Sequence, residues 1–300
     1  MMVREVLEAL EEARDGTILD GTLGGGGHAE AMLQHWPGCR ILGVDRDPEA
    51  LRAATARLSA HSTRVRFLQM TFDQAMDDAQ VMRDGLHGAL LDLGVSSRQL
   101  DAAERGFAFR RGAPLDMRMG EEGQETAADL LNEATEEELA RIFRDFGEEP
   151  RWRKLAREVI RRRRNELFRT SDDLVGALAG ALGRSPSMRE KARVFQALRI
   201  AVNQELSILT RGLERIREGL REGGILAVIS YHSLEDRIVK QAFREWSRDC
   251  ICPPGIPVCT CRGKALGKPL FKGSRDPSDS EVARNPRSRS ARLRAWRKAS

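Results

Sequence analysis

The chain has 300 residues, of which 41% are hydrophobic and 32% are charged, and its formal net charge is +5. This composition can build a folded core, and the mildly basic balance is compatible with a polyanionic partner without requiring one. No hydrophobic run reaches membrane-spanning length, and the first helical pattern carries charges throughout. We therefore expect a cytoplasmic protein with no membrane partner; the composition indicates no oligomeric state.

Short hydrophobic runs alternate with helical patterns along most of the chain. After an N-terminal amphipathic helix we expect strands at residues 17–23, 39–45, 64–70, 88–94 and 223–230, with helices at 28–36, 47–58 and 233–246 between or after them. Residues 268–272 and 291–296 read as two last strands. Strands separated by helices indicate βαβ units, so we expect an α/β fold with a parallel sheet covered on both faces.

The alternation stops between residues 105 and 184. This stretch is charged and shows helical patterns at 126–147, 151–168 and 171–182, and a long helical pattern at 191–220 then leads back to the sheet. We therefore expect one domain made of residues 1–104 and 185–300, with residues 105–184 as an inserted helical domain.

The first turn between a strand and a helix, within "ILDGTLGGGGHAE", carries five glycines in the seven positions from 21 to 27. Such a turn lets a ligand approach the backbone closely. Asp45 ends the second strand, where its carboxylate could accept hydrogen bonds from the ribose of an adenosine-containing ligand. Both NAD and S-adenosylmethionine fit this pattern, but Asp20 and Asp92 end neighbouring strands and favour a cationic ligand over a diphosphate.

Several motifs together resemble one known family. They are "DGTLGGGGH", "GVDRDPEA", "LLDLGVSSRQLD", "RGFAF", "PLDMRM", "FQALRIAVNQEL", "HSLEDRIVK" and "NPRSRSARLR", spread over nearly the whole chain. The sequence is similar to the RsmH (MraW) family of S-adenosylmethionine-dependent methyltransferases. The resemblance implies a class I (Rossmann-like) sheet with an inserted helical domain, residues 105–184, that contacts an RNA substrate. It also implies methylation of the 4-amino group of a cytidine in 16S ribosomal RNA, in the decoding region of the small subunit.

The resemblance also implies the cofactor contacts, which are Gly26, Gly27, His28, Asp45, Phe72, Asp92 and Gln99. Without the resemblance, four of these residues have a simpler structural explanation. His28 would begin a helix and Asp45 would end a strand. Phe72 would pack in the core, and Gln99 would be a solvated loop side chain. Relatives usually carry a His-x-Pro-Val segment upstream of the first helix; if that segment helps to close the cofactor pocket, we expect weaker binding in a chain that opens at "MMVREVLEAL".

Methylation of a cytosine amino group needs a hydrogen-bond acceptor beside a poorly nucleophilic nitrogen. Asp92 is our first candidate for this catalytic role, and the backbone of residues 94–97 is the second. We expect His232, on the loop after the fifth strand, to hold the target base or its ribose. Ser233 and Asp236 read as a helix cap. Tyr231 stands where the family commonly has phenylalanine, a change that keeps the ring and that we expect to be harmless.

Three basic or aromatic segments are candidates for RNA contact. "RGFAFRRGAPLDMRM" at 105–119 offers stacking and phosphate contacts, although core packing explains its methionines better. Arg161 to Arg164 lie on a helix and read mainly as a solvated face. The tail from 284 to 300 carries seven basic residues and no acid, as phosphate-binding segments or solvated ends do.

Four of the five cysteines form the pattern "CICPPGIPVCTC" at 250–261. Four thiolates suit zinc, but the commoner zinc pairs are separated by two to four residues, so free thiols in a proline-rich loop are the alternative. We assign no metal ligand to the active site. Two other functions stay open at this point, a nicotinamide-dependent oxidoreductase and a non-catalytic RNA-binding or assembly factor.

Overall fold

The computed structural model describes residues 1–120, 125–253, 258 and 260–300. The chain forms two compact units, a sheet unit of residues 1–94 and 206–300 and a helical unit of residues 95–205. These bounds differ from the expected insertion at 105–184. The reason is packing: Leu100 and the buried face of α10 (Met188–Asn203), including Val194 and Leu198, belong to the core of the helical unit.

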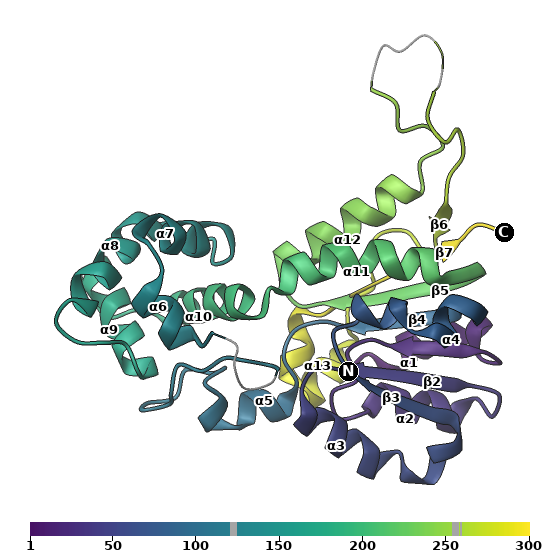
Figure 1. The fold of residues 1–300 in the computed structure, drawn as a ribbon, viewed down its shortest axis with the longest axis horizontal. Coiled ribbons are helices and arrows are strands. Elements are labelled where there is room, and N and C mark those ends of the chain that lie inside the picture. The colour runs from purple at the N-terminus through teal and green to yellow at the C-terminus, as the bar shows by residue number, and fades with distance from the viewer. Residues whose placement is uncertain (121–124, 254–257, 259) are drawn as a thin grey trace. The chain divides into compact units, whose positions relative to one another are not determined.

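A seven-stranded sheet forms the centre of the sheet unit, in the order β3-β2-β1-β4-β5-β7-β6 (Figure 1). The strands are β1 (Thr17–Asp20), β2 (Arg40–Asp45), β3 (Val65–Gln69), β4 (Leu86–Asp92), β5 (Leu220–Ser230), β6 (Gly267–Pro269) and β7 (Arg292–Lys298). The first five are parallel, and β7 is antiparallel to both of its neighbours. The expected α/β class with a Rossmann-like sheet is confirmed, and so are the two late strands.

Hydrophobic residues of the strands alternate between the two faces, as the two-residue period of a strand requires. Leu90 and Ile225 lie in one core with the helices α1 (Val3–Leu10), α2 (Gly27–His35) and α3 (Pro48–Arg57). Leu91 and Leu226 lie in the other core with α4 (Ala79–Asp84), α11 (Glu205–Gly219) and α12 (Ser233–Trp246). Both faces are therefore covered, and a short helix α13 (Asp279–Arg284) precedes β7.

The helical unit contains six helices in its described part, and its own hydrophobic core holds them together. They are α5 (Ser97–Asp101), α6 (Ala127–Glu133), α7 (Glu136–Asp145), α8 (Trp152–Arg163), α9 (Ser171–Leu182) and α10. Thr126, Thr135 and Thr170 each begin a helix as half of a capping box with an acid three residues later. Within the described ranges, no helix is long and hydrophobic enough to cross a membrane.

The single helix expected at 191–220 is wrong, because the chain breaks it into α10 and α11 at Gln204. Gln204 has a φ of 51°, a left-handed conformation that ends α10. The preceding Asn203 is buried, and its side chain accepts a hydrogen bond from the backbone N–H of Met119 at 2.9 Å and donates one to the carbonyl of Met117 at 2.7 Å. These bonds tie the end of α10 into the helical unit at the point where the chain leaves it.

Candidate active site at the carboxyl edge of the sheet

Three neighbouring parallel strands each end in an aspartate. Asp20 ends β1, Asp45 ends β2 and Asp92 ends β4, and β1 lies between the other two strands. In such sheets the carboxyl ends of the strands form the ligand-binding edge. The three acids therefore mark one place in the sheet unit, which is the place that the sequence predicted.

Asp20 is the most deeply buried of the three, with only 1% of its surface exposed. Its Oδ1 has no hydrogen-bond partner among the described residues. Burial raises the pKa of its carboxyl to about 7, with the charge of Asp92 adding to the shift and that of His28 opposing it. A buried carboxylate without a full set of partners is the environment that a cationic ligand would satisfy.

The glycine-rich turn wraps around the end of β1. Gly26 has a φ of 76° and forms the N-cap of α2 in the left-handed region that favours glycine. Gly21 has no room for a side chain, because an added Cβ would lie 2.6 Å from a methyl carbon of Leu91. The turn therefore needs glycine for backbone conformation at one position and for close packing at another.

Asp45 is bound to this turn. Its Oδ2 accepts a hydrogen bond from the backbone N–H of Gly24 at 2.8 Å, and its Oδ1 accepts one from the N–H of Asp47 at 2.9 Å. Burial raises the pKa of Asp45, against the effect of these two hydrogen bonds. Asp47 itself caps α3 by accepting from the N–H of Glu49, as its position before Pro48 suggested. The carboxylate that could hold a ribose is thus fixed in place beside the glycines.

Asp92 lies at the centre of a small polar group. Its Oδ2 is 3.3 Å from Nε2 of His28, and its Oδ1 accepts a 2.6 Å hydrogen bond from the hydroxyl of Tyr231. Its backbone N–H donates to the hydroxyl of Thr22, within the glycine-rich turn, at 2.6 Å. Burial and the charge of Asp92 together raise the pKa of Tyr231, so its hydroxyl stays protonated and donates. The group joins α2, the turn and the loop after β5 to the end of β4.

His232 follows Tyr231 and begins α12. The structure makes His232, and not Ser233, the N-cap residue, so the expected cap of Ser233 with Asp236 is wrong by one residue. Oε2 of the buried Glu235 accepts from the backbone N–H groups of Tyr231 and His232, and its Oε1 lies 3.1 Å from Nε2 of His232. This arrangement fixes His232 at the carboxyl edge of the sheet.

The sequence matches the MraW methylase family over residues 1–299. The chain belongs to this family. It is 50% identical over 285 residues to the ribosomal RNA small subunit methyltransferase H of Gemmatimonas aurantiaca, covering 94% of this chain and 90% of that protein. It is also 48% identical over 307 residues to the enzyme of the same name from Heliobacterium modesticaldum, covering 99% and 97%.

Two solved structures resemble this MraW-family chain more distantly. An rRNA methylase from Streptococcus thermophilus aligns with a TM-score of 0.45 at 10% identity, covering 100% of this chain and 98% of the other. The N-methyltransferase NodS from Bradyrhizobium japonicum aligns with a TM-score of 0.44 at 8% identity, covering 99% and 94%. Family membership therefore comes from the sequence matches. It confirms a methyltransferase that uses S-adenosylmethionine.

The residues at the carboxyl edge of the MraW-family sheet fit this cofactor. S-adenosylmethionine carries a ribose, an ammonium group and a sulfonium, and the edge offers the fixed carboxylate of Asp45 and the incompletely bonded, buried carboxylate of Asp20. Gly27 leaves its side-chain position open, since an added Cβ would have Arg57 Nη1, at 3.5 Å, as its one neighbour within 4 Å. Gly26, Gly27, His28, Asp45 and Asp92 are thus brought together in one unit.

Two residues that we predicted to contact the cofactor, Phe72 and Gln99, also have structural roles in the protein. The ring of Phe72 is buried in the core between the sheet and α11, where an added Cβ at Gly212 would lie 2.2 Å from its Cε2. Gln99 belongs to the helical unit and forms a capping box with Ser96, whose N–H donates to Oε1 of Gln99 at 2.9 Å. Contact of either residue with the cofactor stays a prediction.

The arginine run of α8 is largely engaged within the protein. Arg161 and Arg162 both bind the carboxylate of Glu158 at 2.7 Å. These two contacts outweigh the opposite effect of burial and lower the pKa of Glu158 to about 2. Arg163 donates to the carbonyls of Leu131 and Ala134 at the end of α6. These three arginines therefore contact different parts of the protein.

The basic tail and the aromatic segment also have structural roles. Much of the tail is strand β7, where Arg294 and Arg292 pair with Asp236 at 2.7 and 3.5 Å. In the aromatic segment, Phe107 lies in the core of the helical unit, together with the two methionines of that segment. Phe109 packs edge-on against Phe195 of α10, and Lys191 covers its ring at 3.9 Å.

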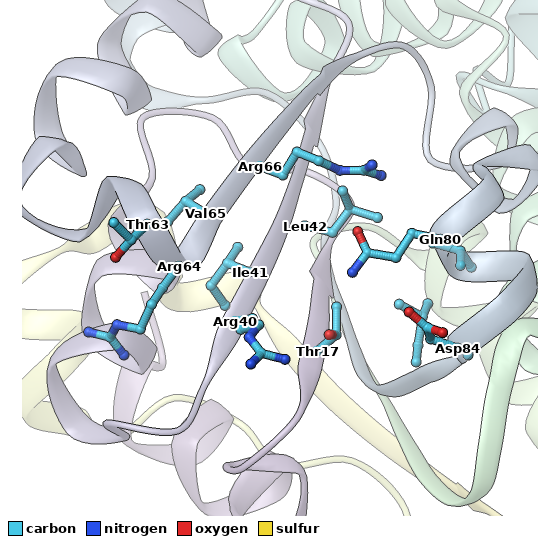
Figure 2. Close-up of a pocket in the computed structure, with 13 residues that line it drawn as sticks. Thr17, Arg40, Ile41, Leu42, Thr63, Arg64, Val65, Arg66, Gln80 and Asp84 are labelled. Carbon is cyan, nitrogen blue, oxygen red and sulfur yellow. The ribbon is translucent and has the colours of Figure 1, made fainter.

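A cavity of about 170 Å³ lies at the opposite edge of the sheet (Figure 2). The first residues of four strands line it, together with Gln80 and Asp84 of α4; they are Thr17, Arg40, Val65 and Leu86. It is therefore separate from the aspartates, which stand at the other ends of the same strands. None of the predicted site residues lines it.

The structure adds new contacts or burial to two residues that we had already named from the sequence. The burial of Asp20 could be anticipated only from its position at the end of a hydrophobic strand. The hydroxyl of Tyr231 contacts Asp92, which lies 139 positions away in the sequence. No local sequence pattern predicts such a contact. Its departure from the family's phenylalanine was the available signal.

Proposed function

We propose that this methyltransferase transfers a methyl group from S-adenosylmethionine to the exocyclic 4-amino group of a cytidine in 16S ribosomal RNA, in the decoding region of the small subunit. Methylation of small-subunit ribosomal RNA is the activity in the names of relatives that share about half of its residues over nearly the full chain. The observation that carries the choice of an amino acceptor is Asp92, a carboxylate held at the strand end beside the cofactor-binding turn.

The aspartates at the carboxyl edge would have different roles in binding the cofactor. Asp45 would hold the two ribose hydroxyls, and Asp20 would face the positive charge of the donor. When bound, S-adenosylmethionine supplies an electrophilic methyl group on a sulfonium. Gly26 and Gly27 would allow the close backbone approach of the ligand, and His28 would border it.

Asp92 would accept a hydrogen bond from the amino group of the cytosine. The nitrogen lone pair of cytosine is delocalised into the ring, so a carboxylate that draws on the amino protons increases its nucleophilicity. Tyr231 donates to Oδ1 of Asp92 and would leave Oδ2, on the His28 side, to meet the substrate. His232, fixed by Glu235, would contact the base or its ribose.

The helical unit would contact the RNA substrate. It begins directly after the strand that ends in Asp92 and carries most of the aromatic and arginine residues that the sequence offered for this role. Because Arg161, Arg162 and Arg163 already have protein partners, we assign phosphate contact in this region to the exposed Arg164. With ribosomal RNA as its substrate, the protein would act in the cytoplasm.

The deciding experiment maps methylated cytidines in small-subunit RNA by mass spectrometry, with the wild-type chain, with Asp92→Ala and without the protein. We expect one methylated cytidine that depends on the wild-type chain and disappears with Asp92→Ala. Assembled subunits and naked RNA serve as alternative substrates. A map that is the same in all three cases would remove the proposed activity, and calorimetry with S-adenosylhomocysteine would separately test the cofactor site.

A further inference from the structure

The segment that connects α12 to β6 brings three cysteines together. The sulfur atoms of Cys250, Cys252 and Cys261 all lie within 4.8 Å of one another, although eleven positions separate the first from the last. A fourth cysteine, Cys259, stands two positions before Cys261 in the sequence and lies outside the described residues. This thiol cluster belongs to neither the cofactor site nor the sheet core.

The spacing of the sulfurs discriminates between a shared metal and a disulfide. Sγ of Cys261 is 3.8 Å from Sγ of Cys250. Two sulfurs at about 2.3 Å from one tetrahedral zinc are themselves about 3.8 Å apart, whereas a disulfide bond is about 2.0 Å long. The observed distance therefore fits two ligands of one ion.

The surroundings stabilise thiolates. The backbone N–H of Ile251 donates to Sγ of Cys261 at 3.3 Å. Hydrogen bonds of this kind favour the charged form of sulfur, which is the form that binds metal.

The cluster also lies where a crosslink would join the two ends of the segment between α12 and β6. It follows the end of α12 by only four residues, and Arg262, next to Cys261, donates to the carbonyls of Glu245 and Arg248 at that helix end. The N–H of Ala265 bonds to Asp249 at 3.2 Å, just before the chain enters β6. The two ends of the connecting segment thus meet beside the thiols.

We propose that Cys250, Cys252 and Cys261 are three ligands of one structural zinc ion that crosslinks the segment between α12 and β6. The one-residue separation of Cys250 and Cys252 is shorter than that of the commoner zinc pairs, but the sulfurs of both residues lie close to that of Cys261. Binding exchanges thiol protons for the metal, so it involves no oxidation and requires only zinc.

The test measures the metal content of the full chain, purified under reducing conditions with zinc in the medium. We expect about one zinc per chain, and, after exchange for cobalt, the intense charge-transfer absorption of tetrahedral cobalt thiolates. Cys250→Ser combined with Cys261→Ser should abolish both signals. If that variant does not fold, the single Cys252→Ser variant should retain the fold and lose part of the charge-transfer intensity.

The matched control is Cys39→Ala, at the fifth cysteine. Cys39 is fully buried in the sheet core, and burial raises the pKa of its thiol to about 12, so its removal should leave metal content unchanged. Chelation should also expose the bonds after Arg248 and Arg262 to trypsin. A metal-free chain with reactive thiols at the cluster, or a Cys250–Cys261 disulfide found by peptide mapping, would overturn the proposal. None of these measurements depends on methyl transfer, so the zinc site and the proposed activity can fail separately.

Discussion

The two edges of the parallel sheet differ in how their charges are satisfied. At the amino edge the cavity is open, and its charges have surface partners: Arg66 pairs with Asp78, and Arg64 donates to several backbone carbonyls. At the carboxyl edge Asp20 is buried and Asp45 is partly buried, and burial raises the pKa of both. The comparison favours the edge with an incompletely bonded buried carboxylate, that of Asp20, over the edge with the cavity as the place where a cationic ligand binds.

Removing the acceptor at the carboxyl edge should give the largest effect. We expect Asp92→Ala to lower the rate of methyl transfer by about a hundredfold or more, in the range of a lost general acid–base group. Asp84→Ala, which changes an acid at the amino edge, is the matched control and should leave the rate unchanged. Single-turnover formation of methylcytidine measures both. Equal losses in the two variants would contradict the distinction between the edges.

The next largest effect concerns the cofactor. Asp45→Ala should weaken S-adenosylhomocysteine binding by about 3 kcal/mol, roughly a hundredfold, because two hydrogen bonds to a charged group are lost. Asp47→Ser keeps a good N-cap for α3 and should bind normally. Isothermal calorimetry reports both affinities. Unchanged binding by the Asp45 variant would place the ribose elsewhere.

The raised pKa of Asp20 predicts a pH dependence of smaller size. In the free protein the carboxyl is protonated below about pH 7, and a cationic ligand favours its ionised form. S-adenosylmethionine binding should therefore release a proton below pH 7 and strengthen as pH rises towards 7. Stability of the free protein has the opposite sign, since the contribution of this group is present at low pH and is lost as pH rises through 7.

Asp20→Asn provides the check on this assignment. It cannot ionise, so the slope of affinity against pH should flatten between pH 5.5 and 7.5. His28, Asp92 and Asp45 are the other titratable groups that act on Asp20, and all three stay in place in this variant. A slope that persists in Asp20→Asn would assign the proton to one of them.

The smallest effect should come from Tyr231→Phe. This change removes one hydrogen bond to the charged carboxylate of Asp92, worth about 1.5 kcal/mol at the low end of its class, and keeps the ring. We expect kcat to fall by about tenfold, with cofactor affinity and thermal stability close to those of the wild type. If kcat does not change, the hydroxyl has no part in positioning Asp92.

The sequence predicted most of the sheet unit and of the acidic edge. Parallel strands bring their carboxyl ends to one edge, so Asp20, Asp45 and Asp92 could be placed together from the end points of three hydrophobic runs. Some local contacts were also readable: Ser96 and Gln99 show the spacing of a capping box, and Glu158 precedes Arg161 and Arg162 by three and four residues on one helix.

The remaining features depend on contacts between distant parts of the chain. The left-handed Gln204 interrupts a continuous helical pattern because its neighbour Asn203 is bound to backbone groups more than eighty positions away. Asp236 does not cap the helix as predicted, and its carboxylate forms an ion pair with Arg294 of the last strand. Helical period and capping rules describe neighbours in sequence, so neither feature could follow from them.

The position of β7 has a consequence for biosynthesis. This strand enters the sheet between β5 and β6, and its Trp296 packs against Trp246 of α12 with ring centres 5.1 Å apart. A chain still attached to a translating ribosome therefore keeps an unpaired edge on β5 and an uncovered tryptophan until its last strand has emerged. Premature termination upstream of that strand should yield an aggregation-prone product rather than a smaller enzyme.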